Sequence, residues 1–120
     1  MKLGKEHLIA RNALEQISSL MDDPIASIRL NSYETMLNIS EFLEGIDHIL
    51  QSDILFLLVD KLIEEKDITI LKKVLFLIKN LLYGENGTYK ALSTAIISRL
   101  TGLLDNKDDE VNYIEKVFFL

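Results

Sequence analysis

Residues 59–65, VDKLIEE, decide the fold, because residues 17–23, ISSLMDD, carry the same pattern 42 positions earlier. The same offset takes Asn38 to Asn80. A third copy of the pattern begins at Leu100, 41 positions after the second copy. Self-similarity at a fixed period is the sequence signature of repeat proteins, in which each unit buries its apolar face against its neighbours. The chain is therefore expected to be a stack of similar layers.

The period and the helical pattern within it indicate the type of repeat. Helical solenoids of the armadillo and HEAT types repeat every 40–47 residues, roughly. The central unit predicts a short helix (45–51), a second helix (53–63), an acidic turn and a long third helix (68–82). Copies of these helices are expected at 13–21, 25–40, 88–93 and 95–104, with a last third helix starting near residue 110. Three helices per unit favour the armadillo pattern over the two-helix HEAT pattern.

We therefore predict an all-α fold, an armadillo/HEAT-like right-handed helical solenoid of about two and a half to three repeats. It is expected to form a single domain over residues 1–120. Its repeats are placed at roughly 5–43, 44–84 and 85–120.

Composition narrows the classes of function. The chain has 120 residues, of which 48% are apolar and 27% charged, enough for one domain with a hydrophobic core. Its 13 Lys and Arg residues against 19 Asp and Glu give a net charge of -6, which argues against nucleic-acid binding. No apolar stretch approaches the roughly 20 residues that span a bilayer. We expect a cytoplasmic protein with no membrane contact.

The residues that carry catalysis or bind metals are sparse. The chain has no cysteine, and its two histidines, His7 and His48, have no second ligand at metal-binding spacing. Neither a Gly-rich phosphate loop nor a nucleophile elbow occurs. The paired acidic residues lie in predicted turns, where solvation is expected. We predict no enzymatic activity, no catalytic residues, no cofactor and no metal.

The polar faces of the predicted third helices supply candidate binding residues. At 100° per residue, each of these helices has a broad apolar face and an opposite polar face. In armadillo solenoids the third helices lie side by side and line a concave groove. Phe76 is an aromatic residue among the polar ones, and such residues often anchor a partner. An ordinary solvated helix face is the alternative. The candidate partner-binding residues on these faces are Asn31, Glu34, Asn38, Lys73, Phe76 and Asn80.

The last predicted helix is apolar nearly all round. Leaving Phe118 and Phe119 in water would forgo roughly 1.5–3 kcal/mol each relative to burial. Solenoid ends usually carry a polar cap instead. We therefore expect a fragment or short form of a longer array, or a partner that covers this end. Phe118 and Phe119 join the partner-binding candidates, and the chain is expected in a larger complex or self-associated through an exposed repeat end.

Residues 58–68, LVDKLIEEKDI, resemble a segment in the armadillo repeats of the radial spoke head fourteen homologue family of motile cilia and flagella. The resemblance spans residues 22–111, about three quarters of the chain. It implies a non-catalytic structural scaffold in the radial spoke of the axoneme. Other radial spoke proteins would then be its partners, and the cilium or flagellum its location.

A second resemblance supports an alternative function. Residues 36–39, MLNI, and 78–81, IKNL, are similar to the L-x-N-L segment of armadillo proteins that bind extended peptides. The resemblance implies that Asn38 and Asn80 clamp a peptide backbone in the concave groove, each through one donor and one acceptor. The chain departs from this group because it has no tryptophan. It also has Ser52 and Thr94 where the armadillo consensus has glycine.

Overall fold

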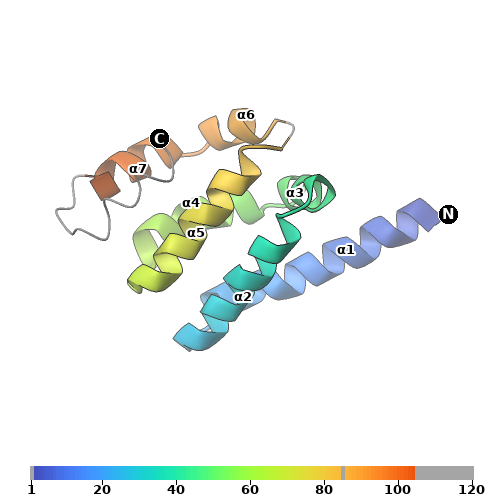
Figure 1. Cartoon of the computed structure of the whole chain (residues 1–120), viewed down its shortest axis with the longest axis horizontal. Helices are drawn as coiled ribbons and strands as arrows, with labels where there is room; N and C mark the ends of the chain where they lie inside the picture. The colour runs from blue at the N-terminus through green and yellow to red at the C-terminus, as the bar shows by residue number, and fades with distance from the viewer. Residues whose placement is uncertain (1, 85, 105–120) are drawn as a thin grey trace.

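The computed structural model describes residues 2–84 and 86–104, over which the chain is helical and contains no strand. The elements are α1 (Lys2–Ser19), the 3₁₀ helix η1 (Leu20–Asp22), α2 (Ala26–Ile39), α3 (Leu43–Leu50), α4 (Ile54–Glu64), α5 (Ile68–Leu81), α6 (Gly87–Leu92) and α7 (Ile96–Leu104) (Figure 1). The predicted all-α class is confirmed. The five helices predicted from residue 45 onward correspond to α3 through α7, with ends within two residues. The right-handed solenoid stays a prediction, and residues 105–120 lie outside the described part.

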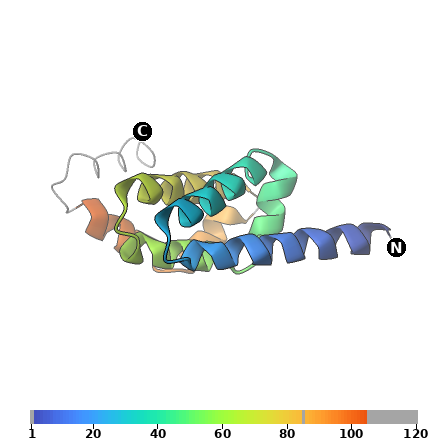
Figure 2. The same cartoon turned by 90° about the horizontal axis from the view of Figure 1, so that it is seen from below.

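The helices form two layers. In Figure 2, α2 and α5 lie in one layer, and α1 and α4 lie in the other. Within the first layer α2 and α5 run side by side in the same direction (Figure 1), and each packs on a helix of the second layer. The radius of gyration is 14.4 Å. This is close to the roughly 14 Å expected for a compact domain of this length.

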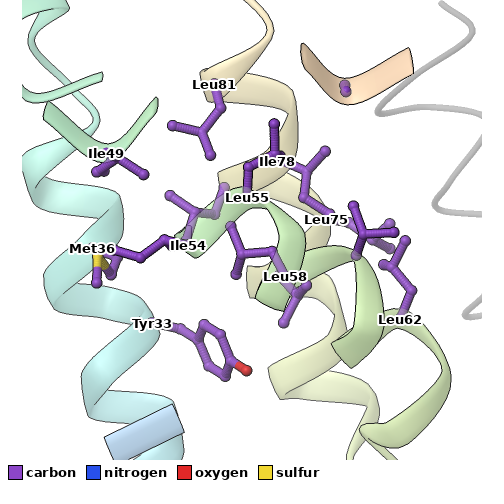
Figure 3. Packing of buried hydrophobic residues seen from close by; sticks show 14 of the residues in the cluster. Tyr33, Met36, Ile49, Ile54, Leu55, Leu58, Leu62, Leu75, Ile78 and Leu81 are labelled. Carbon is purple, nitrogen blue, oxygen red and sulfur yellow. The ribbon is translucent and has the colours of Figure 1, made fainter. Parts of the chain in front are cut away.

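The core fills the space between the layers. Apolar side chains of α2, α4 and α5 meet there, including Met36, Leu58 and Ile78 (Figure 3). Met36 and Ile78 are both fully buried, 42 positions apart, so α2 and α5 occupy matching environments at the predicted offset. The apolar residues of the amphipathic helices supply this cluster, because each helix can remove one face from water only by packing on another.

The predicted offset is wrong by one residue for the helices of the second layer. Met21 is buried like Leu62, 41 positions later, whereas Leu20 and Ile63 are exposed. The 42-residue alignment had paired Leu20 with Leu62 and Met21 with Ile63. The physical reason lies at the end of the first helix, where η1 replaces the last α-helical turn. A 3₁₀ turn has fewer residues than an α-turn, so the chain reaches α2 one residue sooner.

Two glycines occupy equivalent close contacts in successive units. A Cβ atom built on Gly45 would lie 1.9 Å from the Ile39 carbonyl oxygen, and one built on Gly87 would lie 2.0 Å from the Leu81 carbonyl oxygen. Both the glycines and the carbonyls are 42 positions apart. Glycine is required here because the first helix of each unit crosses the end of the preceding long helix at backbone contact. These paired contacts support the repeat hypothesis.

The turn between the first and second helix of a unit is also repeated. The backbone N–H of Ile54 donates to the Ser52 hydroxyl at 3.2 Å, and that of Ile96 donates to the Thr94 hydroxyl at 3.2 Å. A hydroxyl that accepts from a free N–H at a helix start stabilises that start. Ser52 and Thr94 therefore stabilise the start of the second helix of each unit, at the positions where the armadillo consensus has glycine.

Candidate protein-interaction groove

A shallow groove runs between α2 and α5, the two parallel helices of the first layer. Its volume is about 420 Å³. Its walls are Glu34, Leu37, Asn38 and Glu41 from α2, and Lys73, Phe76 and Asn80 from α5. The groove exists because α2 and α5 bury their opposite faces against α1 and α4, which leaves their polar faces side by side.

Five of the eight candidate residues meet in this groove. They are Glu34, Asn38, Lys73, Phe76 and Asn80. Asn31 is exposed on α2 but does not line the groove. Phe118 and Phe119 lie outside the described residues. Leu37 and Glu41 line the groove and were not predicted, because their contribution depends on how close α5 comes, which helical periodicity does not specify.

Asn80 ties the two walls of the groove together. Its side-chain amide donates to the Ser40 hydroxyl at 3.0 Å, and that hydroxyl donates to the Leu37 carbonyl oxygen at 2.8 Å. This relay holds the end of α2 against α5. The Asn80 carbonyl oxygen and its second amide hydrogen remain for other partners.

Asn38 differs from Asn80. Its side chain is exposed and makes no hydrogen bond within the part of the chain that the structure describes. The side-chain amides of Asn38 and Asn80 thus both retain donor and acceptor capacity at the groove. An extended backbone could use that capacity, since it presents one N–H and one C=O per residue.

The charges on the two walls differ in sign. Glu34 and Glu41 lie on the α2 wall, and Lys73 lies on the α5 wall. Phe76, which is 40% exposed, also lies on the α5 wall. An exposed aromatic ring with charged neighbours offers both apolar contact area and electrostatic selectivity. This arrangement suits a polypeptide partner with an apolar side chain flanked by charges.

An ion pair fixes α2 to the turn before α5, below the groove. The Arg29 guanidinium donates to both carboxylate oxygens of Glu65, at 3.0 and 3.1 Å, and also to the Asp23 carbonyl oxygen at 2.9 Å. The Glu65 side chain is only 4% exposed. The hydrogen bonds to Glu65 raise the pKa of Arg29, so the guanidinium stays charged. The ion pair therefore joins the two elements that form the groove walls.

Tyr33 on α2 is a second polar residue near Glu65. Its side chain is completely buried, and its hydroxyl has no hydrogen-bond partner among the described residues. Burial, assisted by the negative charge of Glu65, raises the pKa of the Tyr33 phenol well above its usual value near 10. The phenol is thus neutral at physiological pH and is an unsatisfied polar group in the core.

Over residues 11–84 and 86–102, no cluster of three or more histidine or acidic side chains could hold a metal ion. Within the same region, every helix is too short or too polar to cross a bilayer.

Comparison with known proteins leaves the family open. No protein-family model, no curated protein and no solved structure matches this chain. The resemblance to the radial spoke head fourteen homologue family therefore stays a hypothesis that depends on the residues quoted for it.

Proposed function

We propose that this protein is a non-catalytic scaffold that binds another polypeptide in the groove between α2 and α5. The single observation that supports this function most is the convergence of Glu34, Asn38, Lys73, Phe76 and Asn80 on one groove. These residues come from two helices 42 positions apart, and they leave an aromatic ring and two amides accessible. Such a surface has the aromatic and polar composition of a protein interface.

The cellular setting that we propose is the radial spoke of the axoneme in motile cilia or flagella. Its support is the resemblance of residues 58–68 to the radial spoke head fourteen homologue family. The partners would be other spoke proteins, bound as part of a larger complex. The ion pair between the half-buried Arg29 and the buried Glu65 joins α2 to the turn before α5, and it would support both walls of the groove in such a structural role.

The experiment compares two phenylalanines of equal exposure. Phe76 on α5 lines the groove and Phe56 on α4 does not, and both are 40% exposed. Tagged wild-type protein and the Phe76→Ala and Phe56→Ala variants are expressed in ciliated cells, and the axonemes are extracted. Wild type and Phe56→Ala should recover spoke proteins and localise to axonemes, whereas Phe76→Ala should lose both. If Phe76→Ala recovers them as well as wild type, the groove is not the interaction surface.

Extended-peptide binding by a soluble adaptor is the second candidate function. The observation that favours it is the free hydrogen-bonding capacity of Asn38 beside Asn80. In a peptide-library capture, the double variant Asn38→Ala with Asn80→Ala should lose extended peptides while its helical circular dichroism is retained. Unchanged capture by the double variant would exclude the backbone clamp.

A further inference from the structure

A second recess adjoins the groove at Asn38, where α2 ends and α3 begins. It has a volume of about 500 Å³ and is lined by Thr35, Asn38, Ile39, Phe42, Glu44, Gly45 and His48. We call it the notch. Phe42 is 68% exposed at its edge and offers apolar contact area there.

The corresponding place in the next unit is filled by a helix. Thr35 and Ile39 correspond to Leu77 and Leu81, 42 positions later, and both of these leucines are fully buried. Thr35, in contrast, is exposed and Ile39 is only half-buried. The helix that packs on the end of α5 is α3.

The end of α5 shows how closely α3 fits. Gly84 is the counterpart of Phe42, and a Cβ atom built on Gly84 would lie 2.5 Å from Ile46 and 2.6 Å from Leu50 of α3. Helix α3 therefore covers the face of α5 that corresponds to the open face of α2. The notch is the seat for a helix equivalent to α3.

Residues 2–9 of this chain carry the sequence of such a helix. At an offset of 41, the segment KLGKEHLI aligns with LEGIDHIL of α3, with glycine on glycine and histidine on histidine. Leu8 and Ile9 align with the buried Ile49 and Leu50. The same offset of 41 aligns the buried positions of α1 with buried positions of α4.

In the structure this segment does not turn back onto the notch. It continues α1 as one straight helix, whose N-terminal half projects beyond the rest of the molecule (Figures 1 and 2). The physical reason is a missing cap. The chain breaks between α3 and α4 at Ser52, whose hydroxyl accepts from the backbone N–H of Ile54. The counterpart of Ser52 is Arg11, which is a good helix former and has no hydroxyl that could accept from that N–H.

We propose that residues 2–9 of a second copy of this chain fill the notch, so that two copies exchange their N-terminal helices. A straight α1 presents the segment outward, and exchange of an identical element between protomers is a direct route to dimers. The charges are partly complementary. The segment carries Lys2, Lys5 and Glu6, and the notch is lined by Glu44. Leu8 and Ile9 would supply the apolar contacts that Ile49 and Leu50 make in the next unit.

Sedimentation of the purified full chain tests the exchange. Wild type should be a dimer that dissociates on dilution, and removal of residues 2–9 should give a monomer. Phe42→Asp should weaken the dimer about tenfold or more, because it places a charge in the apolar seat. Its matched control is Leu43→Asp, since Leu43 is 69% exposed but does not line the notch. A wild type that stays monomeric, or a dimer that survives deletion of residues 2–9, overturns the proposal.

Because the chain has no cysteine, disulfide trapping separates exchange from folding back within one chain. A chain with both Leu8→Cys and Thr35→Cys should form disulfide-linked dimers under mild oxidation. Disulfides formed only within single chains would overturn the exchange. Phe76 lines the groove but not the notch, so Phe76→Ala should remain dimeric, and loss of one function is distinguishable from loss of the other.

Discussion

Replacing Tyr33 with phenylalanine should stabilise the protein. The Tyr33 hydroxyl is completely buried and has no hydrogen-bond partner in the described part of the chain. A buried polar group without a partner costs roughly 1–3 kcal/mol, whereas the phenylalanine ring keeps the apolar contacts of the tyrosine. Tyr33→Phe should therefore raise the free energy of unfolding by about 1 kcal/mol, which is roughly 4 °C in melting temperature for a domain of this size.

Chemical and thermal unfolding followed by circular dichroism measure this difference. Tyr89→Phe is the matched control, since Tyr89 is exposed and its change should leave stability within about 0.5 kcal/mol of wild type. A loss of 1 kcal/mol or so in Tyr33→Phe would refute the reasoning, because it would mean that the hydroxyl is hydrogen-bonded, for example to a buried water.

The pH dependence of stability is a second measurement on the same variant. Burial raises the pKa of Tyr33 in the folded state, so the folded chain keeps its phenolic proton where the unfolded chain loses it. The resulting stability is complete below roughly pH 10 and falls by up to about 1.4 kcal/mol per pH unit above it. Tyr33→Phe should lack this contribution. Identical alkaline slopes in the two proteins would contradict the burial of an ionisable phenol.

Three further changes test the fold. Glu65→Ala should lower the midpoint of denaturant titrations, because it removes the carboxylate that accepts two hydrogen bonds from the Arg29 guanidinium. An unchanged midpoint would mean that the pair contributes nothing to stability. Gly45→Ala should cost about 2 kcal/mol or more, since its Cβ would meet a backbone carbonyl, whereas Gly102→Ala meets nothing within 4 Å and should gain about 0.5–1 kcal/mol. Equal melting temperatures for the two alanine variants would contradict the close approach. Ala13→Pro should disfavour a straight α1 by about 3 kcal/mol and convert the exchanged dimer to a monomer in sedimentation; an unchanged dimer would contradict the role of helix continuity.

Repetition made the long helices and their groove predictable. The recurrence of Asn38 at Asn80 placed α2 and α5 in register, and the polar face of each helix followed from the 3.6-residue period. Those two facts suffice to bring both asparagines to one groove, as the structure does. They do not identify Leu37 or Glu41 as wall residues, because helix spacing is set by packing.

The first unit was less predictable, for two local reasons. The 3₁₀ turn at Leu20–Asp22 shifts the burial pattern by one residue, and periodicity alone does not distinguish Leu20 from Met21 as the buried residue. The continuity of α1 depends on an absent cap at Arg11, which becomes informative only after Ser52 is seen to end the equivalent helix. In both cases the deciding feature is a local backbone conformation, which helical periodicity does not specify.

The interaction groove is the central claim, and titration calorimetry of a recovered partner against the two phenylalanine variants tests it most directly. Phe76→Ala should weaken binding about tenfold or more, equivalent to at least roughly 1.4 kcal/mol, because it removes an exposed aromatic ring that lines the groove. Phe56→Ala, with the same 40% exposure outside the groove, should change affinity less than about twofold. Equal affinities for wild type and Phe76→Ala would contradict the account.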